Sequence, residues 1–126
     1  MDLRPNMTMT ARINKNDCWN VALSLATERD YNLVRKNLIK YSSSSGGLSP
    51  YYSQQYLEKY GYIKMDLANY NCKTLRMFAD DTKYTKYRYV VSVSGHIVFI
   101  EKGLIHDSFN SDLKRVIKIM RKKSRR

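Results

Sequence analysis

A cysteine and a histidine stand at the starts of two segments with different periodicities, and both side chains suit nucleophilic catalysis. Cys18 follows Asp17 and opens a stretch with apolar residues at helical spacing, whereas Gly95-His96 opens a β-branched stretch. A thiol attacks a carbonyl only as the thiolate, and a helix N-terminus and a nearby imidazolium both stabilise that anion. We therefore predict that Cys18 is a nucleophile and that His96 is its base.

An acid that could orient the imidazole lies one hairpin further along the chain. If residues 102–103 form a two-residue loop, the strand register places Asp107 diagonally from His96 on the same face of the sheet. A carboxylate there would hold one ring nitrogen toward the sulfur. A three-residue loop would reverse the parity and place His106 or Ser108 on that face instead, so the triad Cys18, His96 and Asp107 depends on the register.

Acyl transfer by a thiolate also needs donors for the oxyanion that forms on attack. The backbone amide of Cys18, at a helix start, is one natural donor. A side chain just upstream would be the second, and Asn16 is favoured over Asn14 because it is nearer to the cysteine; Arg12 is a further candidate.

The elements that must position these residues change type midway along the chain. Residues 1–16 are expected to be extended, and helical spacing, caps and stop signals predict helices followed by strands. Residues 62–67 fit a strand or a linker, and the apolar residues of 113–120 fit either a helix or a last strand. The predicted helices cover 17–26, 30–41, 49–60 and 74–79, and the predicted antiparallel strands cover 84–93, 97–100 and 104–105. Helices first and sheet second indicate an α+β domain.

Composition limits the class of protein. A chain of 126 residues with 43% hydrophobic residues fits one packed domain. The apolar runs are too short for a membrane span, and residues 1–16 lack the apolar core of a signal peptide, so we expect a cytoplasmic protein. Two cysteines, Cys18 and Cys72, are too few for a disulfide scaffold. The cysteines and histidines lack the paired spacing of zinc ligands, so neither a metal nor a cofactor is predicted.

The net charge of +12 is concentrated near the C-terminus. Residues 114–126 contain eight Lys or Arg and no acid, so we separate a domain over 1–113 from a basic C-terminal strand or helix and tail over 114–126. Such a tail commonly aids solubility, and binding of nucleic acid is the alternative. Tyrosines interleaved with basic residues could stack bases on the sheet surface. They are Tyr84, Tyr87 and Tyr89, beside Lys83, Lys86 and Arg88.

These residues together resemble papain-like cysteine peptidases, and more narrowly the short stand-alone members encoded by bacteria and phages, similar to peptidases that trim bacteriocin leaders. The resemblance covers roughly a third of the residues, in two blocks with short motifs. The matching segments are Asn16-Asp17-Cys18, residues 22–27 and 30–31, and then residues 95–98 and 102–108.

The resemblance implies a papain-like fold with N-terminal helices packed on a small C-terminal antiparallel sheet. It implies a hydrolase that cleaves peptide, isopeptide or thioester bonds of a peptide or protein substrate, in a bacterium or a phage-infected host cell, without a cofactor. The family places a glutamine six residues before the cysteine, where this chain has Arg12. The alternative is therefore a catalytically inactive papain-like or basic binding protein that engages a host protein or nucleic acid.

Overall fold

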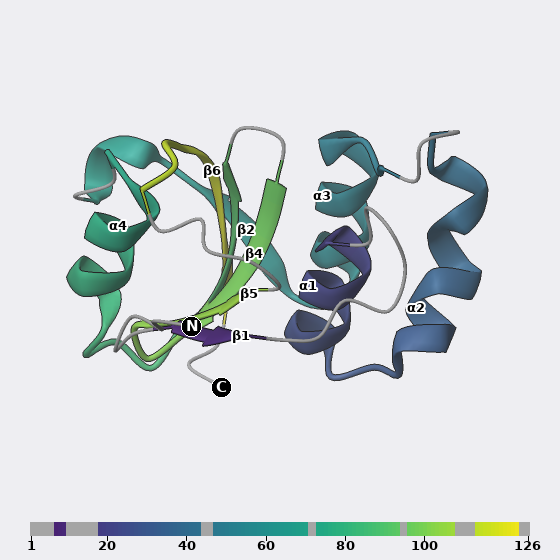
Figure 1. Ribbon diagram of the computed structural model, residues 1–126, viewed down its shortest axis with the longest axis horizontal. Coiled ribbons are helices and arrows are strands. Elements are labelled where there is room, and N and C mark those ends of the chain that lie inside the picture. Colours follow the sequence, from purple (N-terminus) through teal and green to yellow (C-terminus); the bar gives the residue numbers. More distant parts are fainter. Residues whose placement is uncertain are drawn as a thin grey trace.

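A six-stranded sheet lies between two unequal layers of helices (Figure 1). The computed structural model describes residues 7–9, 18–43, 47–70, 73–93, 96–107 and 113–123. The helices are α1 (Cys18–Thr27), α2 (Tyr31–Leu38), α3 (Pro50–Lys59) and α4 (Leu75–Thr82), with 3-10 turns η1 (Ile39–Tyr41) and η2 (Leu67–Asn69). The strands are β1 (Met7–Met9), β2 (Tyr62–Met65), β3 (Arg88–Val93), β4 (His96–Glu101), β5 (Leu104–Asp107) and β6 (Val116–Lys122).

The strand order is β1-β5-β4-β3-β6-β2, and strands β2 to β6 pair with one another in antiparallel fashion. Short β1 adds to β5 in parallel at one edge. The prediction of an α+β domain with helices before an antiparallel sheet is therefore confirmed. Helices cover both faces of the sheet, which the sequence did not predict: α4 lies on the face opposite to α1, α2 and α3 (Figure 1).

Three of the helices begin with a side chain that caps the helix N-terminus. Asp30, Ser49 and Thr74 each accept a hydrogen bond from a backbone N–H in the first turn of α2, α3 and α4, respectively. Pro50 occupies the first turn of α3, where its missing N–H has no partner to lose. The predicted starts of these helices follow from these local signals.

Alternation along the strands divides the apolar side chains into two cores. One core joins the faces of β3, β4 and β6 to α4, and its largest buried side chains include Phe78, Tyr89 and Ile100. The other joins the opposite faces to α1, α2 and α3 around Trp19 and Leu57. Because successive side chains point to opposite faces, a sheet buried on both faces needs apolar residues at nearly every position, which explains the continuous apolar run in β4.

The turn between β4 and β5 fixes the register that the triad prediction requires. Lys102 and Gly103 both have positive φ, 55° and 78°, as a two-residue type I′ turn demands. Glu101 consequently pairs with Leu104, and two pairs further into the hairpin follow the same register. The two-residue loop is confirmed, and the three-residue alternative is wrong.

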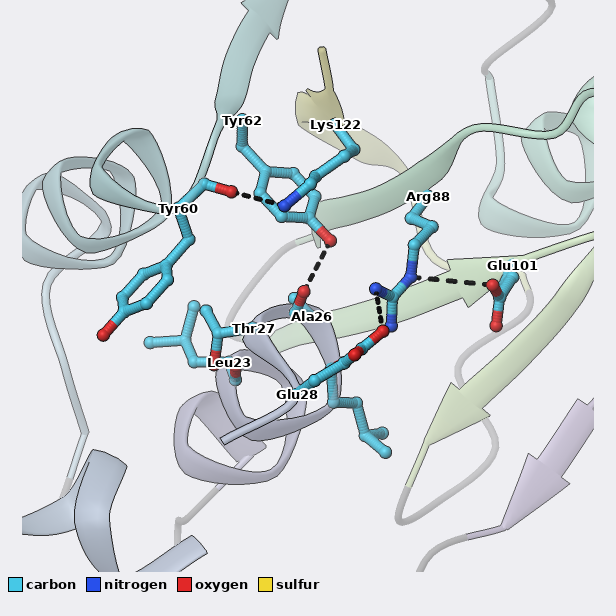
Figure 2. Close-up of polar contacts among 10 residues, drawn as sticks. Leu23, Ala26, Thr27, Glu28, Tyr60, Tyr62, Arg88, Glu101 and Lys122 are labelled. Atoms are coloured by element: carbon cyan, nitrogen blue, oxygen red, sulfur yellow. Dashed lines mark hydrogen bonds and ion pairs between the residues drawn. The ribbon is translucent and has the colours of Figure 1, made fainter. Parts of the chain in front are cut away.

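The C-terminus of α1 is held by donors from distant parts of the chain (Figure 2). Helix ends leave carbonyls without intrahelical partners, and here side chains and one backbone amide supply donors. Glu28 has a φ of 57°, which turns the chain out of the helix. The pairs are Ser24 O with the Arg29 amide at 3.2 Å, Leu25 O with Arg88 Nη2 at 3.0 Å and Ala26 O with the Tyr62 hydroxyl at 2.9 Å.

The basic C-terminal segment is part of the sheet. Residues Val116–Lys122 form β6, an interior strand paired with β3 on one side and β2 on the other. Of the two structures that the sequence allowed for this segment, the strand is therefore correct. Residues 62–65, for which a linker was the alternative, form the edge strand β2. Much of the basic segment thus contributes to the fold.

The tyrosines near β3 do not share one surface. Tyr84 precedes the strand and is 89% exposed, whereas Tyr89 is buried in the α4 core with 2% exposure. Tyr87 lies under the Arg121 guanidinium, 3.9 Å from its ring centroid. The predicted strand over 84–93 begins at Arg88 instead, and the three tyrosines do not offer one common surface on which bases could stack.

Candidate functional site

A cavity of about 560 Å³ lies where α1 begins, β3 ends and β4 begins. Its volume is within the range of about 300–1,000 Å³ that is typical of small-molecule sites. Its walls are mostly apolar, and they combine segments far apart in the sequence. The lining residues are Cys18, Trp19, Ser43, Gly47, Leu48, Ser49, Pro50, Ser53, Ser92, Val93, His96, Ile97, Ile117 and Lys118; we call this space the Cys18 cavity.

Cys18 is the first residue of α1 and carries a half-buried thiol. Trp19, Leu23 and Ala26 fasten the helix to the sheet, with exposures of 2% or less. The helix start is therefore fixed, and the partial positive charge of its N-terminus is directed at the segment that bears the thiol. The thiol thus stands at a helix N-terminus and is partly accessible to solvent.

His96 is the first residue of β4, pairs with Val93 and is 6% exposed. Strand alternation assigns it to the α4 face with Val98, whereas α1 packs on the opposite face. The Cys18 cavity lies at the end of the sheet and is lined from both faces, by Val93 and His96 on one and by Ile97 on the other. The structure thus brings Cys18 and His96 to one cavity around the end of β4.

Asp107 ends β5, where its backbone pairs with Met9 of β1. The side chain of Asp107 lies outside the described part of the structure, so its predicted role as the orienting acid stays a prediction. Asn16, the predicted oxyanion donor, also lies outside it, as do Arg12, Asn14 and Cys72.

His106, the rival imidazole, lies on the face of the sheet that α1 covers, opposite to the face of His96. It pairs with Phe99, and the two ring centroids are 5.4 Å apart. Burial lowers the pKa of His106, so the ring is kept neutral, and it is not among the residues that line the Cys18 cavity. Of the two histidines, His96 is therefore the one that shares a cavity with the thiol.

Lys118 is a lining residue that sequence reasoning missed. Its ammonium donates a hydrogen bond of 2.8 Å to Gln54 Oε1 of α3, and burial is the main cause of its lowered pKa. It was assigned to a solvated basic tail because the segment could not be fixed as a strand. Because side chains alternate between the two faces of a strand, a buried Ile119 on the α4 face implies that its neighbour Lys118 lies on the face covered by α1 and α3.

Comparisons of the chain with protein-family models, with curated proteins and with solved structures gave no significant match. Within the described ranges, no helix is both long and apolar enough to cross a membrane. Across the same residues, no three His, Cys, Asp or Glu side chains come together in a group that could hold a metal ion.

Proposed function

We propose that the protein is a cysteine hydrolase of the papain-like type, with Cys18 as nucleophile, His96 as base and Asp107 as the acid that orients the imidazole. The single observation that carries this proposal is the cavity shared by the thiol at the start of α1 and the imidazole at the start of β4. The order of the two elements, helix then strand, and the position of Asp107 at the end of the next strand support it.

The reaction follows from these groups. The Cys18 thiolate attacks the substrate carbonyl, a carbon–sulfur bond forms, and the oxyanion is stabilised by the amide at the helix start and by Asn16. As the carbon–nitrogen bond breaks, the His96 imidazolium gives its proton to the leaving amine. Water then attacks the thioester with His96 as base, which releases a carboxylic acid and regenerates the thiol.

The residues that line the cavity indicate which chemical groups a substrate should carry near the scissile bond. Trp19, Leu48, Val93 and Ile117 contribute apolar surface, so a substrate with an apolar side chain beside the scissile carbonyl buries that side chain favourably. The ammonium of Lys118 also lies on the lining, and it favours a substrate with an anionic group near the scissile bond.

Iodoacetamide alkylation followed by peptide mass mapping tests the proposal. Cys18 should react faster than Cys72 near neutral pH, because the imidazolium and the helix N-terminus stabilise its thiolate. His96→Ala should remove that advantage. His106→Ala is the matched control and should retain it, because His106 is not among the residues that line the Cys18 cavity. Slow labelling of both cysteines at equal rates in the wild-type protein would contradict the enzyme proposal and favour an inactive member of the fold.

Turnover is tested with fluorogenic peptides that carry apolar residues beside the scissile bond. Cleavage should be lost in Cys18→Ser, while the far-ultraviolet circular dichroism spectrum stays unchanged. Cleavage that persists in Cys18→Ser would assign the activity to another group or to a contaminant.

A further inference from the structure

A second concave site lies between α2, η1 and α3, on the side of the molecule away from α4 (Figure 1). It has a volume of about 390 Å³, again in the range of ligand sites. Its lining is unlike that of the Cys18 cavity, because it combines aromatic rings, amides and cations. The lining residues are Asn37, Leu38, Lys40, Tyr41, Tyr52, Gln55, Tyr56, Lys59 and Tyr60; we call this site the tyrosine cleft.

Aromatic rings form two groups in the tyrosine cleft. Tyr41 and Tyr52 are stacked, with ring centroids 4.5 Å apart and an interplanar angle of 18°. Tyr56 and Tyr60 form a second, tilted pair with centroids 5.1 Å apart. Residues 31–60 hold six of the 11 tyrosines of the chain, and Tyr41 remains 43% exposed although it is a large ring. The site therefore presents flat aromatic surface to an incoming planar group.

Polar groups in the cleft complement a nucleobase and its phosphate. The Asn37 amide donates to the Tyr56 hydroxyl at 3.2 Å, which holds an amide group beside the rings. Lys40 and Lys59 supply two positive charges, and none of the lining residues is acidic. The Lys40 ammonium lies 5.2 Å from the centroid of the Tyr41 ring, so cation and aromatic face are presented together.

We infer that the tyrosine cleft binds single-stranded nucleic acid, with one base stacked against its tyrosines and the flanking phosphates paired with Lys40 and Lys59. Stacking on aromatic side chains combined with a positively charged groove is the usual basis of single-strand binding. The net charge of +12 favours a polyanion over a neutral ligand. The inference is independent of the proposed hydrolase, because no residue lines both the tyrosine cleft and the Cys18 cavity.

The chain offers a matched control for the test. Lys83 and Tyr84 repeat the lysine–tyrosine pair of the cleft, with the ammonium 5.3 Å from the ring centroid, but they lie after α4 on the other side of the sheet. Tyr84 is also more exposed than Tyr41. Equal changes at the two pairs alter the net charge and the aromatic content of the protein identically.

Binding is measured by fluorescence anisotropy with a fluorescein-labelled oligothymidylate of twelve residues. Lys40→Gln with Tyr41→Ala should weaken affinity at least about fivefold, the lower end for loss of one base–aromatic stack. The slope of log K against log salt should fall by about 0.7 for the lost phosphate contact. Lys83→Gln with Tyr84→Ala should change affinity less than twofold, and Cys18→Ser should leave it unchanged.

Competition with thymidine monophosphate and with heparin separates the sources of affinity. The monophosphate should compete weakly, because it lacks the flanking phosphates, and heparin should compete without discriminating the two double variants. Equal loss of affinity in both double variants, or a larger loss on deletion of residues 123–126, would overturn the assignment to the cleft. Failure of the oligonucleotide to bind at low salt would overturn the ligand class.

Discussion

Replacement of Arg88 by methionine tests how α1, the helix that carries Cys18, is held against the sheet. The guanidinium is buried, with 10% side-chain exposure. Its Nη2 donates to Leu25 O at 3.0 Å. Its Nη1 lies 2.6 Å from Glu28 Oε2 (Figure 2). Its Nε lies 3.6 Å from Glu101 Oε2, which is an ion-pair distance but too long for a hydrogen bond.

The magnitude follows from these contacts. A hydrogen bond from a charged donor to a carbonyl contributes about 1.5–3 kcal/mol. The pair with Glu28 adds at most about 1 kcal/mol, because that carboxylate is screened by solvent. Glu28 has 67% side-chain exposure, which justifies the discount. The Arg88 guanidinium also lies 5.1 Å from the centroid of the Phe99 ring. Methionine recovers part of the loss, because it places no cation in the protein interior and can pack on the same ring. The net destabilisation of Arg88→Met is expected to be about 2 kcal/mol, or a fall in Tm of roughly 8 °C.

Urea denaturation followed by circular dichroism measures the free energy of unfolding of Arg88→Met, with Glu28→Gln as the control. The control should lose no more than about 1 kcal/mol, because it removes only the exposed ion pair. Wild-type stability in Arg88→Met, or an equal loss in both variants, would refute the assignment of the main contribution to the Leu25 carbonyl.

Three further predictions concern a glycine in a turn, a buried tyrosine and a partly buried histidine. Gly103→Ala should destabilise the protein by about 2 kcal/mol or more, because φ at Gly103 is +78° and the new Cβ would lie 2.5 Å from Lys83 Cβ. Thermal unfolding measures this loss of stability, and an unchanged Tm would contradict the prediction. Tyr62→Phe should cost about 1–3 kcal/mol in urea titrations, because the Ala26 carbonyl loses its donor. Burial raises the pKa of Tyr62 above its ordinary 10.0, so stability falls as the pH rises above 10, and this decline should be shallower in the phenylalanine variant. Burial lowers the pKa of His106 below 6.5, so stability is lost as the pH falls below that value, and His106→Leu should reduce the loss between pH 7 and pH 5.

Local signals in the sequence were sufficient for the four helices, for the β4–β5 hairpin and for the register of that hairpin. Asp30 and Ser49 cap their helices through bonds within one turn, and Lys102-Gly103 closes a hairpin between adjacent strands. Each of these features depends on residues a few positions apart. The presence of Cys18 at the first residue of a helix and of His96 at the first residue of a strand followed from the same kind of signal.

Features that depend on distant contacts could not be obtained in this way. The strand order places β6 between β3 and β2, and no periodicity in Val116–Lys122 specifies those partners. The burial of Tyr89 and of Arg88 was missed because interleaved tyrosines and basic residues look like a solvated surface, whereas α4 and the end of α1 cover them here. Lys118 entered the candidate site only once its strand was placed.

The position of β6 determines when the sheet can be completed during synthesis. Strand β2 is hydrogen-bonded within the sheet only to β6, although about fifty residues separate them along the chain. When β2, β3, β4 and β5 have been synthesised but β6 has not, one edge of β3 is therefore unpaired and β2 has no hydrogen-bonded neighbour in the sheet. Tyr62 and Val90 share a core with Met120 of β6, so this core can be completed only after residues 116–122 have been synthesised.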